Sequence, residues 1–212
     1  MSDLRYTLVS DGSSDRALLP ILNWLLRDMG VEASMQAQWA DFWSLPSPPK
    51  TLVRKLALAQ ELWPADLLFI HRDAEGRSIE ERVTEIFAAR DEAAQSIALP
   101  PVVCVVPVRM QEAWLLIDEA AIRRAAGNPN GTTVLGIPPL RALERIPDPK
   151  EVLHSALLDA SELSGRRRKK FSAHSRAWSV SKFMYDFSAL RRFDAFNRLE
   201  NSLSDSLEGL PL

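Results

Sequence analysis

The sequence predicts an α/β protein with a mainly parallel sheet flanked by helices, followed by a helical C-terminal extension. Three apolar runs have the length and composition of buried strands, at Leu4–Ser10, Asp66–Ile70 and Val102–Val106. Each run leads into a polar turn and then into a segment with apolar residues at helical spacing. Strands that are apolar on both faces and alternate with helices are typical of a covered parallel sheet with right-handed crossovers.

The first strand leads into residues 11–15, a segment rich in turn and N-cap residues. Apolar residues at helical spacing then predict a helix over Arg16–Met29, and Gly30 is a natural stop. Val31–Trp39 is a weaker strand candidate. After a proline-rich loop, helical periodicity resumes over Thr51–Trp63.

The second strand leads into the loop 71–77, and Ser78 is placed to cap a helix that runs to about Ile97. The third strand is followed by a turn and a predicted helix over Glu112–Ala126, closed by Gly127.

The character of the chain changes after Gly127. A loop over Asn128–Pro139 is followed by predicted helices over Leu140–Ile146, Pro149–Leu163 and Ser179–Leu203, with no comparable strand run. We therefore expect an α/β domain over residues 1–127 and a helical extension over 128–212, packed together as one compact unit.

The composition excludes several classes of protein. The chain has 212 residues, of which 46% are hydrophobic and 25% charged, values typical of a globular protein rather than a disordered or fibrous one. A single cysteine, Cys104, excludes an internal disulfide framework and a cysteine-rich zinc site. Acids stand where a signal peptide would be apolar, and no apolar run reaches the ~18 residues of a membrane span. We expect a cytoplasmic protein without a membrane partner.

Charge is unevenly distributed along the chain, although the net charge is only -2. Residues 1–165 carry 16 Lys and Arg against 23 Asp and Glu, whereas residues 166–212 carry 10 against 5. The basic excess centres on one run: Arg166, Arg167, Arg168, Lys169 and Lys170. This run is a candidate for tracking nucleic-acid phosphates, and the interleaved Trp178 could stack on an unpaired base. The alternatives are a solvated basic loop and a tryptophan in the core.

Acids follow all three predicted strands. Asp11 and Asp15 come after the first strand, Asp73 and Glu75 after the second, and Glu112 after the third. In an open parallel sheet, ligands bind outside the carboxyl ends of the strands, so these carboxylates are expected to converge there. Carboxylate clusters suit Mg²⁺ or Mn²⁺, which can polarise a phosphoryl oxygen and activate water.

Each acid also has an ordinary interpretation. Asp11 could shape the turn, Asp15 and Glu112 could stabilise helix N-termini, and Asp73 and Glu75 could be solvated loop acids. A metal site is predicted because acids follow all three strands, not because of any one of these residues.

Several other polar residues lie beside these acids. His71 could orient a water molecule or contact phosphate, or it could be a buried histidine at a strand end. Arg72, Arg77 and Arg109 could clamp phosphate oxygens or form salt bridges with the acids.

Five segments resemble a known family. The opening motif of Toprim-type domains resembles YTLVSDGSSDRALLPILNWLL, and their second motif resembles LLFIHRDAEG. The Glu-Ala-Trp-Leu-Leu-x-Asp segment of a Toprim-like family of uncharacterised proteins, related to the nuclease domains of the OLD group, resembles VVPVRMQEAWLLIDE. That family's C-terminal helices resemble PDPKEVL and SALRRFDAFNRLENSL. The order and spacing of these motifs carry the resemblance.

The resemblance implies a Toprim fold and a divalent-metal site for phosphodiester chemistry. Asp11 would take the place of the first-motif glutamate as a metal ligand or general acid/base, Asp73 and Glu75 would bind metal, and Glu112 would complete the cluster. Asp118 falls on a family position without an assigned role. Several Toprim-like relatives act in phage defence, often alongside ATPases.

Two departures from the family pattern bear on activity. Asp11 is one methylene shorter than the family's glutamate, and Glu75 is one methylene longer than the second aspartate. Hydrolysis tolerates such shifts less well than metal binding does.

The leading expectation is a Mg²⁺- or Mn²⁺-dependent nuclease acting on nucleic acid, with anti-phage defence as its setting. The alternative is a non-catalytic module that binds a partner such as an ATPase. A third reading is a phosphatase or phosphotransferase for small molecules.

Overall fold

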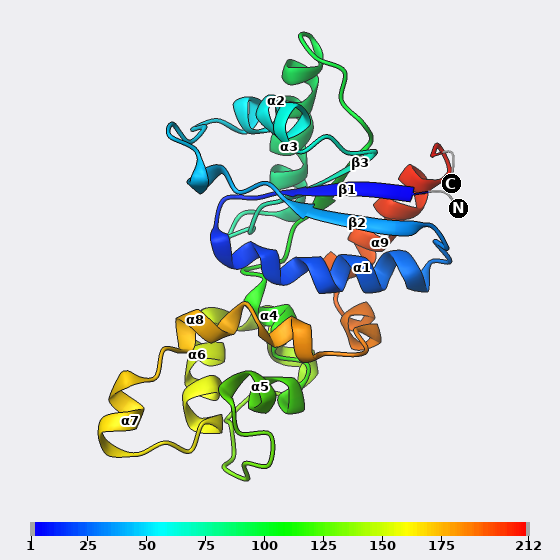
Figure 1. Cartoon of the computed structure of the whole chain (residues 1–212). Coiled ribbons are helices and arrows are strands. Elements are labelled where there is room, and N and C mark those ends of the chain that lie inside the picture. The colour runs from blue at the N-terminus through cyan, green and yellow to red at the C-terminus, as the bar shows by residue number, and fades with distance from the viewer. Residues whose placement is uncertain (1–2, 211–212) are drawn as a thin grey trace.

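The computed structural model describes residues 3–210 and confirms the predicted fold class. Four parallel strands form one sheet in the order β2-β1-β3-β4 (Figure 1). Their bounds are β1 Asp3–Val9, β2 Ser34–Trp39, β3 Leu67–His71 and β4 Val102–Val105. Each strand is joined to the next through a helix.

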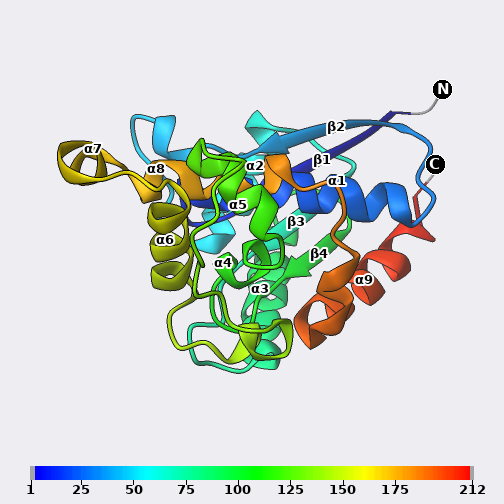
Figure 2. The same ribbon diagram turned by 90° about the horizontal axis from the view of Figure 1, so that it is seen from below.

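Helices cover both faces of the sheet. The helices between strands are α1 (Leu18–Asp28), α2 (Leu52–Leu62) and α3 (Ile79–Ala94). Helix α1 lies on one side of the sheet, and α2 and α3 lie on the other (Figures 1 and 2). No helix in residues 3–210 is long and apolar enough to cross a membrane.

The described chain after β4 is helical, and the extension predicted over residues 128–212 makes up most of it. Its α-helices are α4 (Glu112–Leu115), α5 (Glu119–Ala126), α6 (Pro149–Ala160), α7 (Gly165–Lys170), α8 (Ala173–Ala177) and α9 (Asp194–Leu207). Short 3₁₀ helices join them: η3 (Leu140–Arg145), η4 (Val180–Phe183) and η5 (Ser188–Arg192). Helices α4 to α8 extend beyond the α1 face, and α9 returns to pack on β4 (Figures 1 and 2).

The strands alternate between two cores, as the two-residue period of a strand requires. Leu8 and Phe69 face the α1 side, whereas Val9, Leu68 and Ile70 face α2 and α3. All five side chains are fully buried, so both faces of the sheet are apolar.

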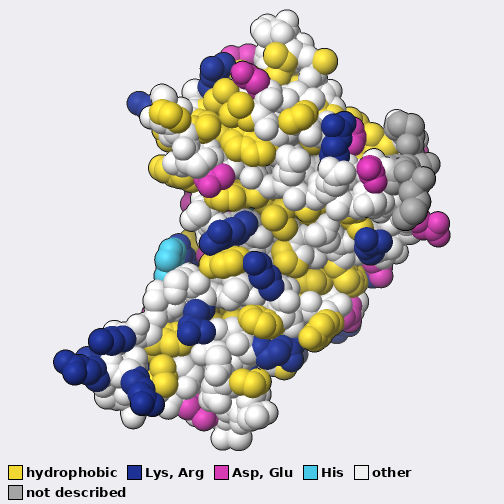
Figure 3. Space-filling view, viewed as in Figure 1, with side chains coloured by type: hydrophobic (Ala, Val, Ile, Leu, Met, Phe, Trp, Pro, Cys, Tyr) yellow, Lys and Arg dark blue, Asp and Glu magenta, His cyan; other side chains and the backbone are white. Residues whose placement is uncertain are grey.

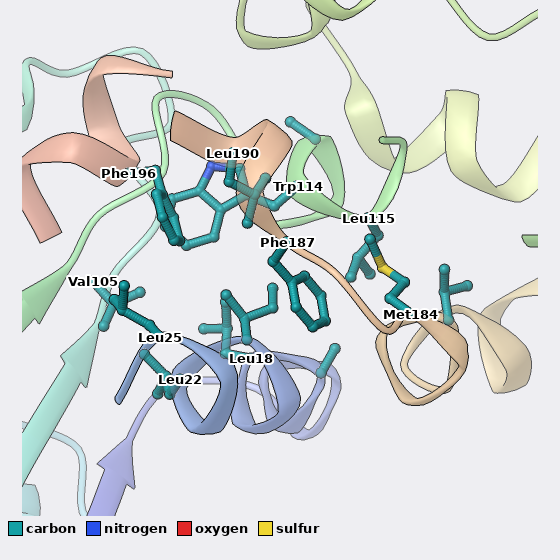
Figure 4. Close-up of a cluster of buried hydrophobic side chains, with 14 of the residues drawn as sticks. Leu18, Leu22, Leu25, Val105, Trp114, Leu115, Met184, Phe187, Leu190 and Phe196 are labelled. Carbon is teal, nitrogen blue, oxygen red and sulfur yellow. The ribbon is translucent and has the colours of Figure 1, made fainter. Parts of the chain in front are cut away.

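The α1-side core continues without a break into the helical part. Trp114 of α4 packs edge-to-face on Phe196 of α9 at 5.5 Å, beside Phe187 and Leu18 (Figure 4). Leu153 of α6 belongs to the same cluster. Burial of these side chains stabilises the sheet and the helical part together.

Three predicted boundaries were wrong. The helix expected over Glu112–Ala126 breaks into α4 and α5, because the Asp118 carboxylate accepts the backbone N–H of Ala121 and begins a new helix. The helix expected over Ser179–Leu203 is three pieces, η4, η5 and α9. Helices α7 and α8 occupy residues 165–177, where no helix was expected.

Candidate active site

A hollow lies at the carboxyl ends of β1 and β3. The strand order reverses between these two neighbours, which is where open α/β sheets bind ligands. The hollow has a volume of about 260 Å³. Its lining residues are Asp11, Gly12, Asp15, His71, Arg72, Asp73, Glu75 and Arg82.

Three carboxylates lie at the deep end of this region: Asp15, Asp73 and Glu112, here called the inner acids. Asp15 and Glu112 are each only 6% exposed. Gln111 bridges two of them, since its backbone N–H donates to Asp73 Oδ1 at 3.0 Å and its side-chain Nε2 donates to Asp15 Oδ1 at 2.7 Å. Asp15 also accepts the backbone N–H of Gly12 at 2.8 Å. The inner acids are therefore ordered by hydrogen bonds that leave their negative charge in place.

Burial dominates the electrostatics of the inner acids. It raises the pKa of Asp73 above the ordinary value, and the charges of Asp15 and Glu75 add to the rise while His71 opposes it. Burial likewise raises the pKa of Glu112, and the nearby charges of Asp73 and Asp15 add to that rise. Among residues 3–210, no Lys or Arg nitrogen lies within 4.0 Å of an inner acid. The charge of Lys150 opposes the rise at Glu112 from a longer distance, so these carboxylates repel one another without a paired Lys or Arg.

His71 is the one basic side chain against an inner acid within the described residues. Its Nδ1 lies 2.9 Å from the carbonyl oxygen of Val105. A carbonyl oxygen only accepts, so Nδ1 carries the hydrogen and Nε2 faces Asp73 Oδ1 at 3.4 Å. This backbone contact fixes the tautomer that leaves Nε2 free to accept a proton or bind a cation.

Asp11 lies at the rim of the hollow and is half-exposed. Its carboxylate pairs with Lys55 Nζ at 2.5 Å and with Arg72 Nη1 at 3.1 Å. The structure thus gives Asp11 two cationic partners, which distinguishes it from the inner acids.

Glu75 lines the hollow and is held in an ion pair at its rim. It adopts a left-handed backbone conformation, with φ of 51°, in the turn after β3. Its carboxylate pairs with the buried Arg82 at 3.2 Å, and Arg82 also pairs with Glu85 at 2.8 Å. Glu85 in turn pairs with Arg72 at 2.8 Å, so an unbroken chain of ion pairs runs around the rim.

The other predicted cations lie farther out. Arg77 is exposed, with Nη1 3.7 Å from Glu85. Arg109 is exposed, and its backbone carbonyl accepts the N–H of Glu75. Both are free to contact a ligand at the mouth of the hollow.

The basic run forms helix α7, whose side chains are all exposed. Arg168 pairs with Asp159 at 3.0 Å. In both ribbon views α7 projects at the end of the molecule where the strands reach their carboxyl ends (Figures 1 and 2). The corresponding Lys and Arg atoms form the group at the lower left of Figure 3.

Gln111 is a site residue that the sequence analysis missed. Its position directly before Glu112, in the turn after a strand of the sheet, is the signal that could have found it. Its Oε1 is buried and accepts no hydrogen bond from the described residues. Rotating the amide would turn Oε1 toward the Asp15 carboxylate, so the observed orientation is the favourable one.

Within residues 3–210, no group of three or more His, Cys, Asp or Glu side chains is close enough together to hold a metal ion. Comparison with known proteins gives no family model that matches the chain, and neither a curated protein nor a solved structure that matches it at a significant level.

Replacing Glu112 by glutamine is expected to stabilise the metal-free protein at pH 8. A carboxyl whose pKa is raised by folding costs no stability below its ordinary pKa of 4.5, and the cost grows as the pH rises above that value. The expected gain is about 1 kcal/mol, or a Tm increase of roughly 2–4 °C, measured by thermal denaturation.

The same substitution is expected to have a smaller effect at pH 4, where the carboxyl is protonated in both states. Glu61→Gln, at an exposed position of α2, is the matched control and should change Tm at neither pH. An unchanged or lower Tm for Glu112→Gln at pH 8 would show that the charge is not destabilising.

Proposed function

We propose that the chain is a divalent-metal-dependent phosphodiester hydrolase of Toprim type, a cytoplasmic nuclease acting on nucleic acid. One observation carries the proposal: the rim acids have Lys and Arg partners, whereas the inner acids have none. Asp15 and Glu112 are buried and Asp73 is partly buried, and carboxylates gathered without a paired Lys or Arg favour either protons or a divalent metal as their counter-charge. The sheet-edge position and the cationic rim favour a phosphate-containing substrate.

The donor set fits Mg²⁺ or Mn²⁺. One or two of Asp73, Asp15 and Glu112 would supply carboxylate oxygens, and the unpartnered Oε1 of Gln111 is a neutral oxygen donor beside them. Mg²⁺ is commonly held by one or two carboxylates, with waters and substrate phosphates completing the octahedron. A site without three converging side chains is consistent with that manner of binding.

Different residues of the chain would have different roles in hydrolysis. A bound divalent cation supplies charge stabilisation at the phosphoryl oxygen and lowers the pKa of water. His71 Nε2, opposite Asp73, is placed to accept a proton in the hollow. Arg72 lines the hollow, and Arg109 lies outside it; both can donate to phosphate oxygens.

The test is calorimetric titration of Mg²⁺ and Mn²⁺ into the protein, followed by incubation with single- and double-stranded DNA and RNA. The wild type is expected to bind metal saturably and to cleave at least one of these polymers. Asp73→Asn/Glu112→Gln should lose binding, because it removes two inner charges and keeps the side-chain shapes. Asp11→Asn is expected to keep metal affinity within several-fold, since Asp11 is already neutralised by Lys55 and Arg72.

One observation favours the second candidate, a non-catalytic module that binds a partner such as an ATPase. Asp11 and Glu75, which the family resemblance places at the metal, are both held in ion pairs. Absence of metal binding and of cleavage in the wild type, together with partner binding that depends on the segment after Arg166, would replace the nuclease proposal with this one.

A further inference from the structure

Two cationic side chains meet on one tryptophan beside the candidate active site. The Arg16 guanidinium carbon lies 3.8 Å from the centroid of the Trp178 ring, and Lys182 Nζ lies 4.0 Å from it. Arg16 belongs to the 3₁₀ helix η1 (Ser13–Ala17), and Lys182 to η4. Segments from opposite ends of the chain thus bring two positive charges to within about 8 Å of each other, a separation at which like charges still repel.

Neither cation has a carboxylate partner within 4.0 Å in residues 3–210, a feature they share with Arg176 over Phe171 but not with Arg191. Arg191 lies over Trp24 at 5.2 Å and pairs with Asp28 and Glu200. The Nε atom of Arg16 is moreover buried without a hydrogen-bond acceptor among the described residues. The pair on Trp178 therefore carries a positive charge that no carboxylate within 4.0 Å offsets.

The position of Arg16 connects this pair to the inner acids. Arg16 directly follows Asp15, whose carboxylate is bonded to Gln111. Stacking on an indole orders both cations in advance, which lowers the entropic cost of binding an anion there. An anion that spans both charges would also remove their mutual repulsion.

We propose that Arg16 and Lys182, held by Trp178, form a phosphate subsite for a nucleic-acid strand whose reacting phosphate lies at the inner acids. The inference rests on the proposed function, because the subsite would bind the nucleic-acid substrate of the proposed nuclease. Trp178 packs against the α1-side core, as its second interpretation expected, and its ring orders the two cations. The subsite contacts the phosphate backbone of the nucleic acid and therefore has no base specificity.

The test is the salt dependence of binding of a fluorescent single-stranded oligonucleotide, measured by anisotropy in EDTA and again with Ca²⁺. Arg16→Ala/Lys182→Ala should weaken binding roughly tenfold at low salt. The slope of log K against log salt should fall by roughly 1.4, at about 0.7 for each lost phosphate contact. Arg54→Ala/Arg90→Ala removes two cations from α2 and α3 and should leave the slope unchanged.

The charge-conserving swap Arg16→Lys/Lys182→Arg is expected to keep the slope, which separates loss of charge from local misfolding. An unchanged slope in the alanine variant, or an equal fall in the α2–α3 control, would overturn the proposal. Binding of inorganic phosphate that needs Arg16 and Lys182, with oligonucleotide binding unaffected, would also overturn it by assigning the subsite to free phosphate.

Failure of the nuclease proposal would be visible separately. Asp73→Asn tests the chemistry and leaves Arg16 and Lys182 in place, so its oligonucleotide slope should match that of the wild type. A protein that cleaves nothing but shows the expected fall in slope would keep the subsite and lose the nuclease.

Discussion

Asp73→Asn is expected to reduce metal-dependent cleavage of nucleic acid by roughly 10³–10⁴-fold in kcat, a loss typical of removing one catalytic group. Asp73 is one of two inner acids that line the hollow, and it lies against both Gln111 and His71. Asparagine keeps the oxygen that accepts the Gln111 N–H and loses the charge that would hold a cation. The measurement is single-turnover cleavage of a labelled oligonucleotide in saturating Mg²⁺.

A matched substitution on α9 makes the result specific. Asp205→Asn removes one exposed carboxylate from another part of the molecule and should retain full activity. The melting temperature of Asp73→Asn should equal or exceed that of the wild type, because the substitution removes a charge that burial disfavours. Full cleavage by a folded Asp73→Asn protein would exclude the proposed mechanism.

Trp114→Ala is expected to cost about 3–5 kcal/mol of unfolding free energy, the range for truncating a buried aromatic side chain to alanine. Trp114 is fully buried and packs edge-to-face on Phe196 (Figure 4). For a chain of this size the loss corresponds to a fall in Tm of roughly 6–20 °C. Because this core joins the sheet to the helical part, calorimetry should show a single lowered transition.

Two variants bracket this effect. Trp114→Phe keeps an aromatic ring on Phe196 and removes an indole N–H that has no acceptor among the described residues, so its cost should be much smaller. Trp43→Ala alters a largely exposed tryptophan and should cost less than about 1 kcal/mol. Two separate transitions in Trp114→Ala would mean that the sheet and the helical part unfold independently.

Three of the four strands were clearly predictable from the sequence because their apolar runs are short and bounded by turn residues, whereas β2 has no apolar run. The helix interruption at Asp118 also left a signal, since Asp118 is a good N-cap residue with Glu119 after it. Apolar residues at helical spacing continue across Asp118, however, so the sequence pattern did not reveal the break between α4 and α5. Helices α7 and α8 gave no such signal, because α7 buries no apolar face and α8 has only five residues.

The strand-end positions of the acids were predictable, but their partners were not. Periodicity places Asp11 and Glu75 after strands, yet it says nothing of Lys55 in α2 or Arg82 in α3, which reach them from other segments. The left-handed turn at Glu75, whose carboxylate pairs with Arg82, also depends on the folded loop. Gln111 was missed because its role arises only where the loops after β1 and β3 meet.

The ion-paired rim allows substitutions around the hollow to occur independently of substitutions at the inner acids. Its charged members are Asp11, Lys55, Arg72, Glu75, Arg82 and Glu85. A rim pair can be exchanged as a pair, acid and base together, without altering the charge of the inner acids. If the proposed function holds, descendants of this chain could change the polyanion they bind through rim substitutions while they keep the same inner acids.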